Sequence, residues 1–219
     1  LSIHSFPTRR SSDLDLSEFA GQQHLVGEGK ILSKLIESDK VPSMIFWGPP
    51  GVGKTTLAQI IASKTKANFI TFSAVTSGIK EIRTVMQQAD RYTRFGEKTI
   101  VFIDEIHRFN KAQQDAFLPF VEKGSITLIG ATTENPSFEV NGALLSSCKV
   151  FVLKNLETSD IEQLLKRAIT DQRGFGDENV NITDDMIHMI AEFANGDARS
   201  SLTDRKSTRL NSSHQYYLV

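Results

Sequence analysis

The 219-residue sequence has little of what disulfide-stapled or membrane-embedded proteins are built from. Its one cysteine, Cys148, has no second cysteine in the chain to pair with. We therefore expect a reducing, cytoplasmic setting, because disulfides persist in oxidising compartments. No apolar run approaches the ~18 residues that predict a membrane span, so no membrane partner is expected. The formal net charge of −1 neither indicates nor excludes nucleic-acid binding.

A globular protein with a buried core is predicted instead, since 39% of the residues are hydrophobic and 23% are charged. Its strongest pattern is an apolar run, Met44–Trp47, followed by a glycine-rich turn and the start of a helix. The phosphate-loop pattern G-x-x-x-x-G-K-[ST] is satisfied by Gly48, Gly53, Lys54 and Thr55. The alternative is a Gly/Pro turn that happens to end in Lys-Thr, which the flanking strand and helix disfavour.

The chemistry of phosphate binding explains this spacing. Glycines let backbone N–H groups close around phosphate oxygens, and the next helix points its positive N-terminus at the same charge. We expect Lys54 to reach the β- and γ-phosphates and the Thr55 hydroxyl to hold Mg²⁺. The residues predicted to bind nucleotide in this stretch are Pro49, Pro50, Gly51, Val52, Gly53, Lys54, Thr55 and Thr56.

A second apolar run, 99–105, ends in two carboxylates, Asp104 and Glu105. Continuous apolar runs are typical of strands buried on both faces of a parallel sheet, where ligands bind at the carboxyl ends. We therefore predict that Asp104 holds Mg²⁺ through water and that Glu105 polarises the water that attacks the γ-phosphate. The alternative is that both carboxylates only cap the next helix.

The next strand, 125–131, delivers Thr132 and Thr133 to the same edge, where their hydroxyls can contact the γ-phosphate or the attacking water. Alternatively they form a Ser/Thr turn. His107 has no metal-ligand partners at a useful spacing, so a surface or helix-capping role is expected.

The order of elements predicts an α/β fold with a five-stranded parallel sheet flanked by helices, followed by an incomplete small helical lid domain. We place the nucleotide-binding domain at 15–155 and the partial lid at 156–203. One amphipathic helix is predicted over 111–123, and a capping box at 159–162 opens the first lid helix. A last helix from Thr183 is expected to bury Met186, Ile187, Ile190 and Phe193.

Both ends of the chain look foreign to this pattern. Residues 5–14 and 204–214 match translations of common sequencing-library adapters. Our hypothesis is that 1–14 and 204–219 are adapter-derived tails, which fold reasoning should exclude. The alternative is that they are basic, Ser/Arg-rich arms that bind nucleic acid.

Four strings carry a family likeness: G-P-P-G-V-G-K-T-T, I-V-F-I-D-E, L-I-G-A-T-T and G-D-A-R. Together they resemble an AAA+ P-loop ATPase of the clamp-loader type. Two longer strings, D-E-I-H-R-F-N-K-A-Q-Q-D and G-A-T-T-E-N-P-S-F-E-V-N, resemble the replication-associated recombination protein A family. The likeness runs from Asp15 to about Thr203.

This resemblance implies ATP and Mg²⁺ as ligands and a set of roles. Gly21 and Gln22 would belong to the segment near the adenine, and Lys54, Thr55, Asp104 and Glu105 would bind and hydrolyse the nucleotide. Thr133, with Thr132 as the alternative, is similar to sensor 1. Arg199 is similar to the sensor 2 arginine of the lid, which reports on phosphate.

The resemblance also implies partners: a cytoplasmic, nucleoid-associated homo-oligomer with DNA-dependent ATPase activity in replication, recombination and repair. It would act at single-strand/double-strand junctions or gaps and associate with single-stranded-DNA-binding protein. A branch-migration motor of the RuvB type shares the phosphate loop, but H-R-F-N-K-A-Q-Q-D argues against it.

Two departures from the family pattern matter. Ser147 stands where the family has an arginine finger, a group that contributes ~10³ to 10⁵ in rate in other nucleotide hydrolases. Lys149 lies two residues further on and is not expected to replace it. The rest of the lid and the oligomerisation region are also missing, so weak activity is expected of this chain. The alternative function is therefore a nucleotide-binding switch with little turnover.

Overall fold

The computed structural model describes residues 15–73, 77–171 and 182–202. Within these ranges the chain forms two compact units. The sheet unit consists of residues 15–19, 23–48 and 54–153, and the helical unit consists of residues 20–22, 49–53 and 154–202. The predicted tails 1–14 and 204–219, and Thr203 at the end of the predicted lid, lie outside the described residues.

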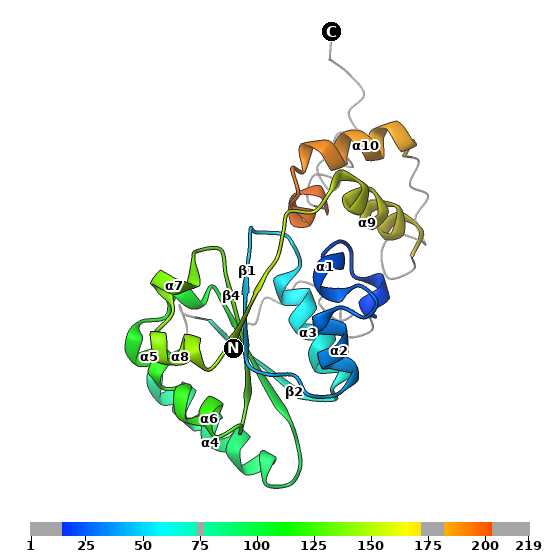
Figure 1. Ribbon diagram of the computed structural model, residues 1–219. Helices are drawn as coiled ribbons and strands as arrows, with labels where there is room; N and C mark the ends of the chain where they lie inside the picture. Colours follow the sequence, from blue (N-terminus) through cyan, green and yellow to red (C-terminus); the bar gives the residue numbers. More distant parts are fainter. Residues whose placement is uncertain (1–14, 74–76, 172–181, 203–219) are drawn as a thin grey trace. The chain divides into compact units, whose positions relative to one another are not determined.

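Five parallel strands form the centre of the sheet unit (Figure 1). They are β1 (Met44–Trp47), β2 (Asn68–Ser73), β3 (Thr99–Asp104), β4 (Thr127–Thr132) and β5 (Lys149–Val152). The strand order is β2-β3-β4-β1-β5, which confirms the predicted five-stranded parallel sheet. Because β4 pairs with both β1 and β3, the carboxyl ends of these three strands meet at one edge of the sheet.

Strand β3 shows why the predicted strands form. Its first five residues are all buried, and the sixth, Asp104, is exposed. Apolar, mostly β-branched side chains suit a strand with both faces covered by helices. The chain therefore leaves the core at the carboxylate, and the core fixes where Asp104 emerges.

Helices cover both faces of the sheet. They are α1 (Gln23–Val26), α2 (Ile31–Glu37), α3 (Lys54–Lys64), α4 (Ile79–Thr93), α5 (Lys111–Asp115), α6 (Leu118–Glu122), α7 (Pro136–Glu139) and α8 (Gly142–Ser146). Helices α4 to α8 lie on one side, and α2 and α3 lie on the other (Figure 1). Helix α3 buries Leu57, Ile60 and Ile61 completely. This packing anchors the helix whose first residue is Lys54.

The single helix predicted over 111–123 is wrong, because two short helices, α5 and α6, occupy this stretch. Pro119 lies in the first turn of α6. A proline there is tolerated, but inside one continuous helix it would remove a hydrogen bond and clash with the carbonyl four residues earlier. Asn110 begins α5 with a capping box that it shares with Gln113.

Two described helices, α9 (Thr158–Thr170) and α10 (Asp184–Phe193), pack together in the helical unit. Their common core is Leu156, Ile161, Leu165, Ile187, Ala191 and Ala194. The predicted capping box at 159–162 is misplaced by two residues, since Glu157 is the N-cap of α9 and Asp160 completes the box. The carboxylate of Glu157 takes the N-cap role that was predicted for the serine at 159.

The predicted burial of α10 is only half right. Ile187 is buried and Ile190 packs against the core, but Met186 and Phe193 are exposed. Helical spacing places these side chains on an apolar stripe, yet the described residues of the unit cover only part of it.

Every helix among the described residues is too short or too polar to cross a lipid bilayer.

Candidate functional site

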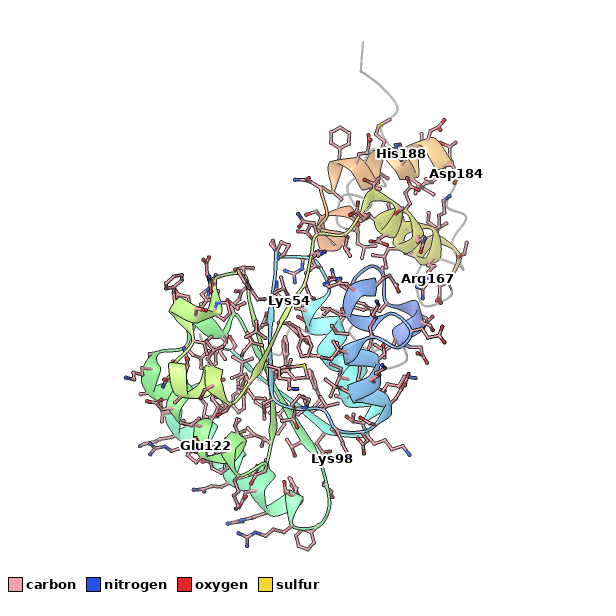
Figure 2. The ribbon with its side chains drawn as sticks, viewed as in Figure 1. Lys54, Lys98, Glu122, Arg167, Asp184 and His188 are labelled. Carbon is pink, nitrogen blue, oxygen red and sulfur yellow. The ribbon has the colours of Figure 1, made fainter. Side chains whose placement is uncertain are left out.

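Lys54 is the first residue of α3 and is buried (Figure 2). Its Nζ donates a hydrogen bond to the Gly48 carbonyl oxygen at 2.8 Å. An ammonium removed from water needs strong compensation. Phosphate oxygens would supply a full opposite charge, so this lysine fits the phosphate-binding role that the loop pattern predicts.

The tip of the phosphate loop, Gly51, requires glycine for two reasons. Its φ is +71°, in the left-handed region. A Cβ there would also lie 1.7 Å from Asp197 Oδ1. Ala198 N–H donates to the Gly51 carbonyl at 3.1 Å, so within the helical unit the G-D-A-R segment packs directly on the loop. No local sequence pattern indicates this close approach.

Asp197 also organises the backbone that carries Arg199. Its Oδ1 accepts hydrogen bonds from the N–H groups of Arg199 at 2.8 Å and Ser200 at 3.2 Å, as an N-cap does. The Arg199 residue itself is exposed. Arg199 belongs to the helical unit, and its sensor 2 role stays a prediction.

The sheet edge brings the predicted sheet-unit residues together. Gly48 N–H donates to the Thr132 carbonyl at 3.1 Å, which ties the start of the loop to the end of β4. Asp104 ends the neighbouring strand β3, and Thr55 lies in the first turn of α3. A carboxylate and a hydroxyl are the oxygen ligands that Mg²⁺ prefers, so this donor set fits a hydrated magnesium ion.

Among the described residues, no group of three or more His, Cys, Asp or Glu side chains is placed to hold a metal ion.

Glu105 has an unusual conformation for the residue that follows a strand. Its φ and ψ are 50° and 53°, the left-handed region, which costs a non-glycine residue about 1–3 kcal/mol. Its Oε2 is buried and accepts no hydrogen bond. Strain and an unsatisfied carboxylate oxygen in one residue are typical of functional sites. Both features favour the catalytic role. Simple helix capping is disfavoured for a separate reason, because the Glu105 side chain makes no cap hydrogen bond to the turn that follows.

The two threonines at the end of β4 differ. Thr132 is completely buried, and its Oγ1 bonds the N–H and the carbonyl of Glu134. Thr133 is partly exposed. The more accessible Thr133 is therefore the better candidate for a contact with the γ-phosphate, and Thr132 forms part of the turn that the sequence left open as the alternative.

The expected surface or capping role for His107 is wrong. It lies in the one-turn 3₁₀ helix η3 (Ile106–Arg108), and its side chain is 17% exposed. Its Nδ1 lies 3.0 Å from Thr132 Oγ1 and 3.2 Å from Glu105 Oε2. The sequence pattern was considered only for metal binding by His107, and the missed signal was its spacing, two residues after Glu105, the carboxylate predicted to be catalytic.

Gly21 and Gln22 are both buried with positive φ. The Gln22 side chain donates through Nε2 to the Lys154 carbonyl at 2.6 Å and accepts from the Lys154 N–H at 2.9 Å. These two hydrogen bonds hold the segment that contains Gly21 and Gln22 against Lys154, at the start of the stretch that leads to α9. The adenine-side role of both residues stays a prediction.

Ser147 is the C-cap residue of α8, and its Oγ donates to the Ala143 carbonyl at 3.1 Å. A short, neutral side chain bonded to its own helix cannot extend a positive charge into a neighbouring molecule. Next to it, burial raises the pKa of the Cys148 thiol to about 12, which keeps this thiol protonated at neutral pH.

Comparison with known proteins places this site in a family. Residues 44–156 match the family model described as ATPase family associated with various cellular activities (AAA). The match includes the phosphate loop, both acidic residues and both threonines. The chain belongs to this family of AAA ATPases, and it is accordingly a nucleotide-binding protein.

More specific similarity comes from individual proteins. The chain is 55% identical over 188 residues to replication-associated recombination protein A of Haemophilus influenzae. It is 54% identical over 189 residues to the protein of the same name from Escherichia coli strain K12. The alignments cover 85% and 86% of the chain and 42% of each relative, so the chain spans less than half of their length.

Among solved structures, the Thermotoga maritima RuvB Holliday junction branch migration motor has a TM-score of 0.73 and 29% identity. The match covers 89% of this chain and 64% of that one.

Proposed function

We propose that the chain binds ATP with Mg²⁺ and hydrolyses it, as the motor part of a protein that acts on DNA in replication-associated recombination and repair. The observation that carries the proposal is that β1, which leads through the phosphate loop to Lys54, and β3, which ends at Asp104 next to Glu105, flank β4 and end at the same edge of the sheet. The names of its relatives, which are more than half identical to it, support the DNA-related role.

In this proposal each residue has one task. Lys54 and the N-terminus of α3 bind the β- and γ-phosphates, and Thr55 and Asp104 hold the magnesium ion, Asp104 through water. A magnesium ion held there would neutralise charge that develops on the phosphate oxygens. Glu105 orients the attacking water and takes its proton, while Thr133 hydrogen-bonds the γ-phosphate.

The other parts of the proposal rest on similarity alone. We propose four of them on this basis: activation by DNA junctions or gaps, association with single-stranded-DNA-binding protein, homo-oligomerisation of the longer protein, and a cytoplasmic, nucleoid-associated location. Adenine-side contacts by Gly21 and Gln22 and phosphate sensing by Arg199 are proposed on the same basis.

Ser147 supports a second candidate function, a nucleotide-binding switch with little turnover. An arginine finger supplied by a neighbour contributes ~10³ to 10⁵ in rate. Ser147 has no charge and bonds its own helix. A chain of this kind would bind ATP and change conformation while hydrolysing it only slowly.

RuvB-type branch migration is the weaker alternative. Its structural similarity is high, but identity is 29%, against 54–55% for the recombination proteins.

Steady-state ATPase measurements with and without gapped DNA test the proposal, using the chain and its Ser147→Arg variant. We expect slow turnover that gapped DNA accelerates, and faster turnover in Ser147→Arg at protein concentrations high enough for copies to meet. Ser146→Arg is the matched control, because it adds the same charge one residue away. Equal rates in all three proteins would contradict the arginine-finger argument, and tight ATP binding without turnover in any of them would favour the switch.

A further inference from the structure

The imidazole of His107 lies between Glu105 of the proposed hydrolysis site and Thr132, the buried threonine at the end of β4. Its Nδ1 is 3.0 Å from Thr132 Oγ1, with the geometry of a hydrogen bond, and 3.2 Å from Glu105 Oε2, without it. The Glu105 oxygen is buried and accepts no hydrogen bond in this state. His107 Nδ1 thus lies within hydrogen-bonding distance of Glu105 Oε2, but its hydrogen bond is made with Thr132 Oγ1 instead.

The backbone around His107 fixes this arrangement. Ile106 is completely buried, and the next two residues complete the single turn of η3 before Phe109 returns to the core. Gly130 on β4 leaves room for the turn, since a Cβ there would lie 3.0 Å from Ile106 Cδ1 and 2.7 Å from Ile45 Cδ1. Close packing of η3 on β4 is what brings His107 to Thr132.

The protonation pattern of Nδ1 follows from Thr132. Its Oγ1 already accepts from the Glu134 N–H at 3.0 Å and can donate to the Glu134 carbonyl at 3.2 Å. When the hydroxyl proton is used in this way, Nδ1 must be the donor toward Oγ1. The same N–H can then serve Glu105 after a small rotation of the ring or of the carboxylate.

We propose that His107 is a positioning residue for Glu105: its Nδ1–H exchanges between Thr132 and the Glu105 carboxylate and so sets where that carboxylate lies during hydrolysis. This inference rests on the proposed ATPase function. His107 touches neither nucleotide nor water in this role. It holds a strained glutamate in one orientation, and through Thr132 it links that orientation to the end of β4, where Thr133 faces the γ-phosphate.

Two substitutions separate the two ring nitrogens. The amide nitrogen of Asn reaches the position of Nδ1, whereas the longer side chain of Gln places its amide nitrogen near that of Nε2. We therefore expect His107→Asn to retain most of the turnover. His107→Gln and His107→Ala should lose about 10- to 100-fold in kcat, the usual loss when a supporting hydrogen bond to a functional group is removed. The Kd for ATP should change less than about threefold in all of them, because the lost bond orients Glu105 and binds no phosphate.

The experiment measures kcat, KM and the Kd for ATP in the whole chain, together with Glu105→Gln and Arg108→Ala. Arg108 is an exposed neighbour in the same turn, and its substitution should leave kcat unchanged. A double-mutant cycle of His107→Ala with Thr132→Val should be non-additive, since both remove the same link. Matching thermal stability of the Asn and Gln variants would show that differences in kcat do not arise from misfolding.

The outcomes are distinct. If Glu105→Gln hydrolyses ATP at the rate of the unaltered chain, the proposed function is wrong in its catalytic residue. If Glu105→Gln abolishes turnover while His107→Ala keeps the full kcat, or if Asn and Gln lose the same amount, only the positioning role of His107 is overturned. Loss in Gln and Ala with rescue by Asn supports it.

Discussion

The sheet unit and the helical unit position their candidate functional residues in different ways. In the sheet unit, Lys54, Asp104 and Glu105 lie at element ends whose places follow from parallel pairing and a fully buried core. Among its described residues, the helical unit has a core of six buried side chains, and charged groups on its surface link α9 to α10. Backbone pairing therefore determines the arrangement of the sheet unit, whereas the arrangement of the helical unit depends on a few side chains.

The largest effect is expected from the small core of the helical unit. Ile187→Ala should cost about 2–5 kcal/mol in the free energy of unfolding of that unit, because it leaves a cavity among few contacts. Far-UV circular dichroism reports on both units, and fluorescence of Trp47, the single tryptophan, reports on β1. In Ile187→Ala, circular dichroism should show a transition at lower denaturant concentration than in the unaltered chain, whereas the Trp47 fluorescence transition should not move.

Met186→Ala is the control for this experiment. Met186 is exposed on the same helix, so its loss should change stability by less than about 0.5 kcal/mol. If Ile187→Ala shifts both signals together, the two units unfold as one and the contrast between them is wrong.

A second prediction concerns Lys54 in the sheet unit. Lys54→Ala should weaken ATP binding by about 10- to 150-fold, the equivalent of about 1.5–3 kcal/mol for a hydrogen bond to a charged group. Lys64→Ala, at the other end of α3, removes only an exposed ion pair with Asp15 and should leave the affinity unchanged. Isothermal titration measures both. Equal affinities in the two variants would remove Lys54 from the phosphate site.

The next effect tests the cap in the helical unit. Asp197→Ala should destabilise that unit by about 1 kcal/mol, since the N–H groups of Arg199 and Ser200 lose their acceptor. Asp197→Asn keeps an oxygen at the same place and should lose much less. Denaturant unfolding followed by circular dichroism measures the two. An equal loss in Asn would mean that the charge of Asp197, rather than its cap, is what matters.

The smallest effect is a pH response of opposite sign in the two units. Hydrogen bonds from Lys123 and Ser125 lower the pKa of Asp90 in the sheet unit to about 2. Its contribution to stability is complete above its ordinary value of 3.8 and is lost as the pH falls from about 4 through about 2. Asp90→Asn should remove this part of the acid dependence.

In the helical unit, a hydrogen bond to Glu162 raises the pKa of His188 above its ordinary value of 6.5. Its contribution is complete below pH 6.5 and is lost as the pH rises through the raised value. His188→Gln should flatten the stability of the helical unit in this range. Denaturation at several pH values, read by circular dichroism and by Trp47 fluorescence, would contradict the comparison if both units lost stability in the same direction.

Much of the sheet unit could be predicted from the sequence. Buried parallel strands leave long apolar runs, and such runs end where polar residues emerge, so β3 and Asp104 were placed correctly. The helix over 111–123 was wrong because apolar spacing continued across Pro119, which the backbone could not follow.

Three-dimensional contacts account for the other errors. Periodicity shows which side chains share a stripe but not whether a neighbour covers it, so Met186 and Phe193 were wrongly expected to be buried. The place of His107 depends on how closely η3 packs against Gly130, and the approach of Asp197 to Gly51 joins residues far apart in the sequence. No local pattern carries such contacts.

The Glu105→Gln variant decides whether the ends of β1, β3 and β4 form a hydrolysis site in which Glu105 activates water. ATP binding and ATP turnover are measured on the same preparation of this variant. We expect an unchanged Kd with turnover reduced at least about 10²-fold, the lower range for a catalytic base. Retained turnover, with binding intact, would contradict this role of Glu105.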